Sequence, residues 1–562
     1  MAATGNASRQ STEVPSGYRL IKKIADGGAT VIYRAARESD RQNVVIKTLR
    51  DDHATRENIA MLLHEADVLS SLTGNNIIGL VEVSKTRNLT SLVLEDTGGQ
   101  SLDQLIAHRR IPLKACVGIG IAVTKALADI HKGGVIHKDI NPSNIIVNPK
   151  TNTIRLVDFG IASYYATEQA TMMSPSSVPG TPGYMSPEQT GRMNRSVDYR
   201  SDFYSLGATL YELVTGRPLF SADEPIEWFH CHIARTPVTP ADVNSSIPRI
   251  LSDLIMKLLA KTAEDRYQSA TGLLHDLREC YAQLNTRAAI QEFQLASRDL
   301  PDHFRIPQKL YGREKEVNQL LQGFEAAYDQ VSLALVAGRS GTGKSSLINE
   351  LHKPVTARRG YFIVGKFDLV HRDIPYNGLA IALRDLVQQI LTESNQRLAQ
   401  WKRKLEQALG PNGALMTEML PELRLIMGEQ PKVESVGPTE SDQRFRLTLF
   451  NFIRVFSHAD HPLVLVLDDL QWADSSTMQL ADLLVDQVEG DRLMVVGAYR
   501  DNEVTPDHPL IQTLQQMQGT DIFLTHIELK PLDVPDICRL LADTLLTTTS
   551  ERQGRVIDHD SA

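Results

Sequence analysis

Five polar residues in the first third of the chain have the types and the order that phosphoryl-transfer chemistry requires. They are Lys47, Glu65, Asp139, Asn144 and Asp158. A carboxylate such as Asp139 can accept the proton of an attacking hydroxyl, while an amide and a second carboxylate can hold a divalent metal ion. A lysine held by a glutamate supplies fixed positive charge for phosphates. The set therefore predicts a nucleotide-dependent phosphoryl-transfer site.

The elements that must position these residues follow from the apolar pattern. Short runs of β-formers at Val44–Lys47 and Ser91–Leu94 predict strands. Apolar residues spaced by three and four predict helices over Glu57–Leu72, Cys116–His131, Asp202–Thr215 and Ile250–Leu259. A β-rich part followed by a helical part predicts one two-lobed α+β domain over residues 18–282.

Ordered clusters make this segment resemble a eukaryotic-type Ser/Thr protein kinase domain. The clusters are His137–Asn144, Leu156–Gly160, Gly180–Glu188, Asp202–Gly207 and Glu264–Tyr267. The resemblance implies the two-lobed protein-kinase fold and transfer of the ATP γ-phosphoryl group to a protein hydroxyl. By the same resemblance, Thr181 after Gly180 favours Ser or Thr as the acceptor.

The resemblance also implies a role for each residue of the set. These roles are the catalytic base for Asp139, Mg²⁺ ligation for Asn144 and Asp158, and phosphate binding for Lys47 with Glu65 as its partner. Gly27, at the glycine-rich loop, would bind ATP. Glu95, within an adenine hinge at Leu94–Asp96, would also bind ATP. Arg266 would pair with Glu188.

Two positions depart from the pattern of that family. The stretch Ala25–Thr30 keeps only Gly27 at a matching position of the glycine-rich loop. Asn141 stands where Ser/Thr kinases usually carry a lysine, so one positive charge is absent where negative charge builds up. The alternative interpretation is an ATP-binding pseudokinase scaffold whose output is set by the second domain. Because the base and the metal ligands are all present, we favour catalysis.

Hydroxyl side chains are frequent between Ile161 and Pro179. They are Thr167, Thr171, Ser174, Ser176 and Ser177. Two interpretations stay open for this loop. The residues could be phosphorylated, or they could simply be solvated.

A second phosphate-binding motif lies later in the chain. Gly338–Ser345 fits G-x-x-x-x-G-K-[ST], follows the predicted strand Val331–Ala337 and begins a predicted helix. In such a loop the backbone N–H groups surround the phosphates, the lysine contacts the outer ones and the hydroxyl binds Mg²⁺. The predicted ATP-binding residues are Gly338, Gly341, Gly343, Lys344 and Ser345.

Two aspartates follow another predicted strand, Leu463–Leu467. Asp468 is expected to help Ser345 hold Mg²⁺, and Asp469 is the candidate base that polarises the attacking water. Strands alternating with helical stretches predict an α/β P-loop NTPase domain with a parallel sheet. Within it, residues 409–439 contain several Gly and Pro and are predicted to form a loop or insertion.

Residues 309–550 resemble the STAND-type AAA ATPases of bacterial regulators. The resemblance rests on Tyr311–Glu314, the phosphate-binding loop and Leu467–Asp474. It implies that Arg500 is a sensor arginine near the γ-phosphate and that the domain is a nucleotide-dependent switch. A helical lid and a winged helix follow in that family. Because the chain stops at Ala562, we expect a truncated ATPase followed by a tail at 551–562.

Composition limits the classes of protein that the chain can be. Its 562 residues are 42% hydrophobic and 23% charged, as expected for two or three globular domains. A net charge of -9 gives no electrostatic footprint for nucleic acid. Four scattered cysteines and no apolar run of membrane-spanning length favour a cytoplasmic protein. A disordered N-terminus at 1–17 and a linker at 283–308 complete the organisation.

The whole chain resembles the N-terminal half of bacterial hybrid sensor kinases. These join a Ser/Thr kinase to a STAND-type ATPase. The resemblance implies ATP and Mg²⁺ as cofactors, a protein with Ser or Thr acceptors or the chain itself as substrate, and signalling proteins as partners. The rival interpretation is that the ATPase drives the biology and the front domain only regulates it.

Overall fold

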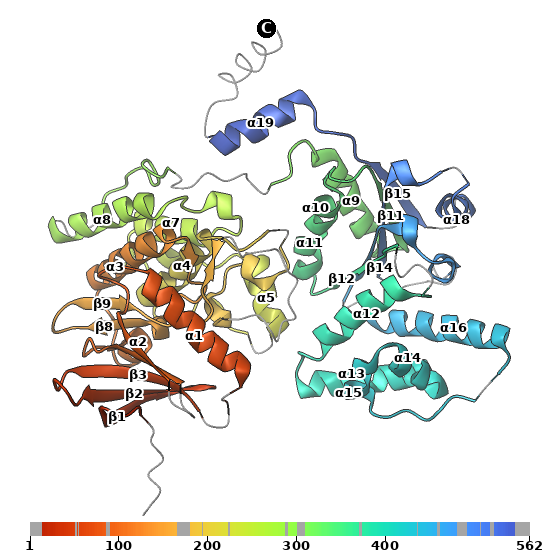
Figure 1. The fold of residues 1–562 in the computed structure, drawn as a ribbon. Helices are drawn as coiled ribbons and strands as arrows, with labels where there is room; N and C mark the ends of the chain where they lie inside the picture. Colours follow the sequence, from red (N-terminus) through yellow and green to blue (C-terminus); the bar gives the residue numbers. More distant parts are fainter. Residues whose placement is uncertain are drawn as a thin grey trace, which may run out of the picture.

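The computed structural model describes residues 14–545 apart from short internal segments. The internal residues outside the description are 51–52, 54, 86–89, 166–179, 194, 223–224, 287–289, 301–308, 370–373, 435, 458–460, 480–491, 506 and 518–521. All five hydroxyl residues of the predicted phosphorylation loop lie outside the described residues, as do the predicted tail and most of the predicted N-terminal segment. The described chain forms two bodies, one from β1 to α8 and one from α9 to α19 (Figure 1).

The first body begins with a five-stranded antiparallel sheet in the order β1-β2-β3-β5-β4. Its strands are β1 (Tyr18–Asp26), β2 (Thr30–Arg37), β3 (Asn43–Leu49), β4 (Leu80–Lys85) and β5 (Thr90–Glu95). Helix α1 (Arg56–Ser71) packs against the sheet through buried Leu62 and Leu69. The Thr55 side chain caps this helix by accepting a hydrogen bond from the Asn58 backbone N–H. The predicted strands and helix of this lobe are confirmed.

The second lobe of this body is mainly helical. Its helices are α2 (Leu102–His108), α3 (Leu113–Lys132), α4 (Arg200–Thr215), α5 (Pro225–Ile233), α6 (Pro240–Val243), α7 (Arg249–Leu258) and α8 (Ala270–Thr286). Short strands lie between the lobes: β6 (Gln100–Ser101), β7 (Val135–Ile136), β8 (Ile145–Asn148), β9 (Thr153–Leu156) and β10 (Ser163–Tyr164). One buried apolar cluster runs from Leu69 through Phe159 to Leu254 and so joins the two lobes. The predicted α+β two-lobed fold is confirmed.

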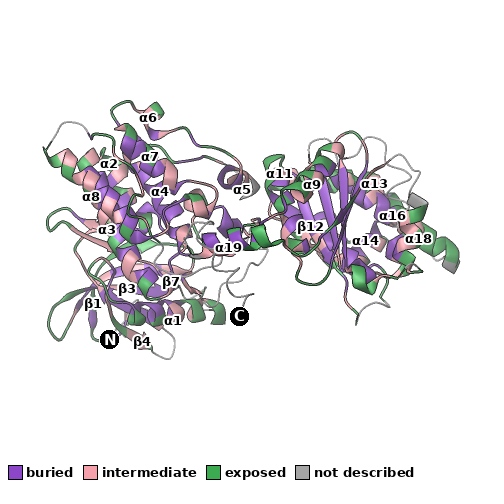
Figure 2. Cartoon of the chain, turned by 90° about the horizontal axis from the view of Figure 1, so that it is seen from above, coloured by how far each residue is buried: buried purple, intermediate pink, exposed green. Residues whose placement is uncertain are grey.

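The second body is a parallel sheet in the order β12-β13-β14-β11-β15 with helices on both faces. Its strands are β11 (Ser332–Ala337), β12 (Tyr361–Lys366), β13 (Leu463–Asp468), β14 (Leu493–Tyr499) and β15 (Phe523–Glu528). Its helices are α9 (Glu314–Ala326), α10 (Lys344–Ile348), α11 (His352–Ala357), α12 (Asn377–Ile390), α13 (Asn395–Leu409), α14 (Gly413–Met419), α15 (Arg424–Met427), α16 (Pro438–Phe456), α18 (Pro509–Met517) and α19 (Val534–Leu545). The central strands are buried on both faces, as a parallel sheet requires (Figure 2). The predicted α/β domain is confirmed.

Two parts of this body go beyond the prediction. Residues 409–439 form an insertion, which is one of the two predicted alternatives, and it consists of short helices whose Met416, Leu420 and Leu423 are buried in the same core as α13 and α16. Its glycines and prolines lie mainly between or at the starts of these helices. Strand β15 was not predicted, and it extends the sheet beyond β11.

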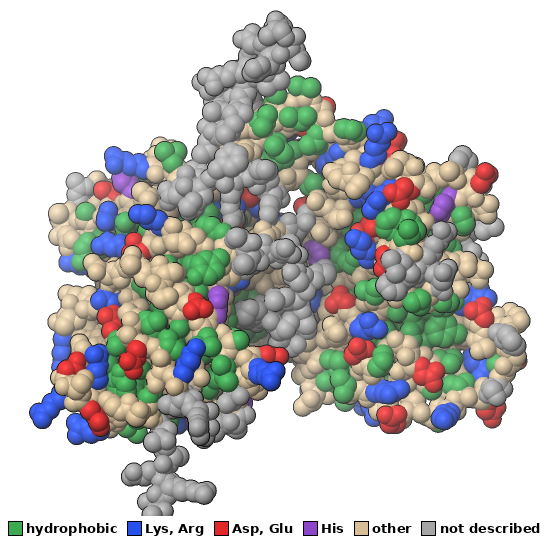
Figure 3. All heavy atoms as spheres, viewed as in Figure 1, with side chains coloured by type: hydrophobic (Ala, Val, Ile, Leu, Met, Phe, Trp, Pro, Cys, Tyr) green, Lys and Arg blue, Asp and Glu red, His purple; other side chains and the backbone are tan. Residues whose placement is uncertain are grey.

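The surface and the cysteines add two observations. All four cysteines are buried and unpaired. The face in Figure 3 shows Lys and Arg side chains mixed with Asp and Glu over both bodies. Among the described residues, no helix combines the length and the apolar character needed to cross a membrane.

Candidate active sites

The first site is built around a buried lysine between two carboxylates. Lys47 on β3 places Nζ 2.8 Å from Glu65 Oε2 of α1 and 2.8 Å from Asp158 Oδ1. Burial acts to lower the pKa of Lys47, but the two carboxylates outweigh burial and raise it. Burial acts to raise the pKa of Asp158, yet the charge of Lys47 lowers it. At neutral pH this arrangement keeps Lys47 and Asp158 charged and close together.

Asp139 follows β7, and its carboxylate is held from two sides. The Thr181 backbone N–H donates to Oδ1 at 2.9 Å, and Asn144 Nδ2 donates to Oδ2 at 2.8 Å. Because Asn144 uses its Nδ2 for Asp139, its Oδ1 faces away from that carboxylate. The half-buried Asp139 is thus fixed where it can accept a proton.

The loop that carries Asp139 is anchored to the helical lobe by a buried aspartate. Asp202 on α4 accepts hydrogen bonds from the backbone N–H of His137 at 3.0 Å and of Lys138 at 2.8 Å. His131 Nε2 lies 2.9 Å from Asp202 Oδ2. These bonds hold Lys138 at a φ of 69°, which a non-glycine residue rarely adopts.

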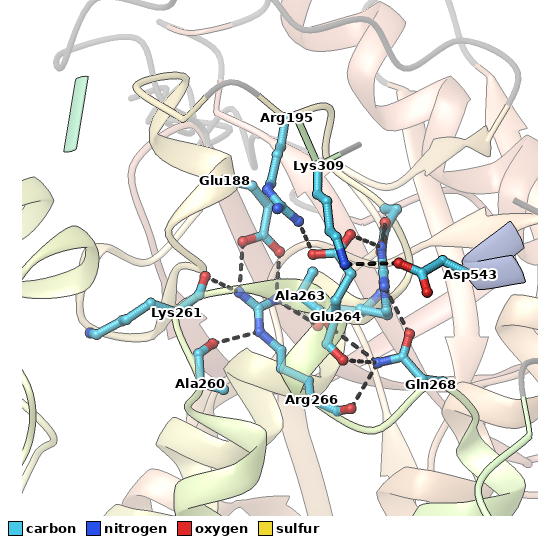
Figure 4. A network of polar contacts seen from close by, with 12 residues as sticks. Glu188, Arg195, Ala260, Lys261, Ala263, Glu264, Arg266, Gln268, Lys309 and Asp543 are labelled. Carbon is cyan, nitrogen blue, oxygen red and sulfur yellow. Dashed lines mark hydrogen bonds and ion pairs between the residues drawn. The ribbon is translucent and has the colours of Figure 1, made fainter. Parts of the chain in front are cut away.

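A second buried ion pair closes the segment after Gly180. Both guanidinium Nη atoms of Arg266 donate to Glu188, at 2.6 and 2.8 Å (Figure 4). Ser201 Oγ donates to the same carboxylate at 2.6 Å. Burial acts to raise the pKa of Glu188, but Arg266 lowers it. The structure therefore brings together the pair expected from the sequence.

The turn at the predicted nucleotide loop is a tight hairpin between β1 and β2. Gly27 and Thr30 exchange backbone hydrogen bonds of 3.1 and 3.2 Å. Neither Gly27 nor Gly28 has a positive φ, and a Cβ at either position would meet nothing closer than 3.9 Å. The turn as it stands here does not require glycine at these two positions.

The predicted hinge lies at the end of β5. The backbone N–H of Glu95 donates to the Gly79 carbonyl at 2.9 Å, and its side chain accepts from Arg155 Nε at 2.8 Å. The Glu95 carboxylate is thus committed to Arg155, so any contact with adenine would come from the hinge backbone.

Asn141 makes hydrogen bonds that hold the loop of Asp139, a role that the sequence did not predict. Its Nδ2 donates to Thr181 Oγ1 at 3.0 Å and to the Asp139 carbonyl at 3.2 Å. Its Oδ1 accepts from the backbone N–H of Ser143 at 2.9 Å and of Asn144 at 3.3 Å. An Asn followed by Pro and Ser is a typical capping sequence, and this sequence could have indicated the role of Asn141. Asn141 ties the loop of Asp139 to the segment after Gly180.

The second site lies at the carboxyl ends of the parallel strands. The loop after β11 carries Gly338, and Gly341 and Gly343 have φ values of 80° and 92°, which glycine adopts without strain. Lys344 begins α10, and its Nζ donates to the Gly338 carbonyl at 2.7 Å. Burial lowers the pKa of Lys344. Ser345, the next residue of α10, is exposed.

Asp468 is the last residue of β13, and Asp469 follows it directly. Burial, followed by the neighbouring Asp469, raises the pKa of Asp468. Asp469 has a φ of 57° and lies 3.3 Å from Arg500 Nε. Gln471, which the sequence did not single out, donates to Asp469 at 3.0 Å and accepts from the Arg500 backbone N–H at 3.1 Å. Gln471 thereby joins the ends of β13 and β14.

Both sites have ligands suited to a magnesium ion. In the first, the Asn144 Oδ1 and the ionised Asp158 are hard oxygen donors on adjacent loops. In the second, the Ser345 hydroxyl belongs to α10, which follows β11, and the Asp468 carboxylate is at the carboxyl end of β13 in the same parallel sheet. Oxygen donors of this kind fit Mg²⁺, which takes few protein ligands and keeps several waters.

Comparison with known proteins assigns both bodies. Residues 18–277 match the protein kinase domain model, and residues 309–496 match the AAA ATPase domain model. The chain joins a protein kinase domain to an AAA ATPase domain. The two matches cover the sites around Asp139 and around Lys344.

Several relatives share the kinase part. A hybrid signal transduction histidine kinase of Dictyostelium discoideum is 39% identical over 324 residues, which are 54% of this chain and 9% of the relative. A probable serine/threonine-protein kinase of Clostridium perfringens is 34% identical over 264 residues, 47% of this chain and 38% of the relative. The serine/threonine-protein kinase PknB of Mycobacterium tuberculosis is 31% identical over 267 residues, 46% of this chain and 42% of the relative. The chain therefore spans less than half the length of each of these proteins.

Proposed function

We propose that the first domain is a Ser/Thr protein kinase that uses Mg²⁺ and ATP, and that the second domain binds ATP as a coupled switch. The observation that carries the proposal is the arrangement of the first site. Lys47 joins Glu65 and Asp158, while Asn144 and Thr181 together hold Asp139. This set supplies the charge, the base and the oxygen donors that phosphoryl transfer requires.

The proposed reaction uses these residues in a definite order. Lys47 holds the phosphates of ATP while Glu65 fixes its position. A substrate hydroxyl attacks the γ-phosphorus in line, its proton passes to Asp139, and ADP leaves. Mg²⁺, when bound by Asn144 and Asp158, would neutralise charge on the phosphates.

The acceptor is proposed to be a Ser or Thr hydroxyl of another protein or of this chain. Support comes from the relatives named as serine/threonine-protein kinases and from Thr181, which contacts Asp139 and Asn141. Signalling proteins are the proposed partners, and no nucleic acid is expected. The proposed location is the cytoplasm, where ATP is abundant and unpaired thiols such as these four stay reduced.

The experiment is transfer of radiolabel from [γ-³²P]ATP to a dephosphorylated protein substrate by wild type and by Asp139→Asn. We expect the variant to be slower by a factor of about 10² to 10⁴, because it loses the general base. Equal incorporation by the two proteins would refute the kinase proposal.

Asn141 and the glycine-poor hairpin favour a second candidate function, the pseudokinase scaffold. Asn141 brings no positive charge to the site, although it keeps the loop in place. This candidate predicts that ATP binds the first domain while wild type transfers no more label than Asp139→Asn.

A further inference from the structure

The two domains meet at a buried contact that neither sequence motif predicts. Helix α11 of the ATPase domain packs against helix α5 of the kinase domain (Figures 1 and 2). Arg192 of the kinase domain donates through Nη2 to Gln389 Oε1 of α12 at 2.8 Å. Arg359, which follows α11, lies 3.3 Å from Glu227 of α5. We call these contacts the coupling interface.

The arginine at the centre of the coupling interface is almost completely enclosed. Arg192 is 7% exposed, Gln389 is 5% exposed, and the guanidinium also lies 5.2 Å from the centre of the Phe229 ring. Gln389 in turn donates to Asp385 at 3.0 Å. A buried guanidinium is costly unless it is hydrogen-bonded, so the geometry of this contact is specific. Small displacements of α12 relative to Arg192 should break it.

On the ATPase side, the coupling interface continues directly into the phosphate-binding loop. Residues from Lys344 to Ala357 form one helical run, in which a 3₁₀ turn at Asn349–Leu351 separates α10 from α11. Pro354 lacks the N–H that a continuous α-helix would need, which accounts for the irregular turn. A displacement of Lys344 on binding nucleotide would therefore be carried along the run to α11.

On the kinase side, the coupling interface continues to the catalytic aspartate. We call residues 181–193 the positioning segment. His232 of α5 lies 2.8 Å from the Pro182 carbonyl, and Met185 packs with Phe229 in a small apolar cluster. The Thr181 N–H at the start of this segment donates to Asp139. Arg192 is near the other end of the same segment.

From this continuity we propose that nucleotide bound at Lys344 strengthens the coupling interface and thereby stabilises the positioning segment that holds Asp139. The structure supports the link between docking and the site, because the docked domains coexist with the Asp139 and Lys47 contacts. The inference rests on the proposed function for nucleotide binding at Lys344 and for its effect on phosphoryl transfer. The change at the coupling interface can be measured without any transfer.

The first test measures amide hydrogen exchange in the full chain carrying Lys47→Ala, which weakens nucleotide binding in the kinase domain. Adding Mg·ADP should slow exchange in the positioning segment and in α5 by about five-fold or more, the usual range of coupling between sites. The matched control adds Lys344→Ala and should show no such slowing. No slowing, or equal slowing in both proteins, would overturn the proposal whether or not the chain is a kinase.

The second test asks whether the coupling reaches the catalytic rate. Lys344→Ala and Gln389→Ala should each lower label transfer by about five-fold or more, and the double variant should be no slower than either single one. Arg359→Ala should lower transfer, whereas Arg358→Ala should not, because Arg358 pairs with Glu325 of its own domain. Additive effects in the double variant would contradict the proposal. If wild type equals Asp139→Asn, the kinase function fails and the exchange test alone decides.

Discussion

At the residue scale, the first site is a set of hydrogen bonds in which each polar group has a defined partner. Lys47 serves two carboxylates, and Asp139 accepts from Thr181 and Asn144. The raised pKa of Lys47 follows from this pairing, since the carboxylates favour the charged ammonium more than burial disfavours it. The same few contacts thus keep Lys47 charged and fix the positions of Lys47 and Asp139.

Asn141 gives the prediction that belongs to this scale. Asn141→Ala should lower kcat about ten-fold or more, because it removes hydrogen bonds worth about 1 kcal/mol each to Thr181 and to the loop of Asp139. Asn141→Lys should be faster than Asn141→Ala, because it adds positive charge where the transferred group is negative. Steady-state kinetics at saturating ATP checks both. Equal rates for the two variants would show that charge at this position does not matter.

The residues of the two sites could be proposed from the sequence because their types occur in a fixed order. Their contacts with Thr181 and Gln471 could not, since the order of residue types along the chain does not show which groups meet in the fold. The hairpin at Gly27 and Gly28 shows the opposite limit. The resemblance to kinases made the missing glycines of this loop appear important, whereas the backbone of the hairpin has no positive φ.

At the element scale, helix α5 contacts three different parts of the molecule. Its His232 lies 3.0 Å from Tyr204 and 2.8 Å from the Pro182 carbonyl, while Phe229 of the same helix faces Arg192. One short helix therefore contacts the helical core, the positioning segment and the second domain.

His232 gives a prediction of pH dependence. Burial first, and then the charge of Lys261, lower its pKa to about 3 from 6.5. Between these values the unfolded chain binds a proton that the folded chain does not, so stability falls as pH falls below 6.5. From this group the kinase domain should lose about 1 kcal/mol of unfolding free energy between pH 6.5 and 5.5.

The measurement is urea unfolding at pH 6.5 and 5.5 for wild type, His232→Gln and the control His108→Gln at an exposed position. Wild type and control should lose more stability over this interval than His232→Gln. If all three lose the same amount, His232 does not stay neutral in the fold.

Elements were predicted well where a long pattern existed and poorly where it did not. Strands β13 and β14 are continuous apolar runs, but β15 has only one fully buried residue, Ile527, so its pattern is weak. In residues 409–439 the helices are too short to show a period, and Gly and Pro at their ends suggested a loop.

At the scale of the whole molecule, two nucleotide sites share one chain and meet through the coupling interface. This contact joins Arg192 to Gln389, nearly two hundred positions apart, and no local pattern indicates such a pairing. The sequence therefore predicted two domains but not how they touch. The coupling that we propose arises only from the assembled fold.

The central claim is that Lys47, Asp139, Asn144 and Asp158 act on one nucleotide. The most direct measurement is a crystal structure of the full chain with Mg²⁺ and a non-hydrolysable ATP analogue. The account predicts Mg²⁺ bound by Asn144 and Asp158, Lys47 on the phosphates and Asp139 facing the γ-phosphate. An analogue bound away from these side chains, or Asp139 turned away from the γ-phosphate, would contradict it.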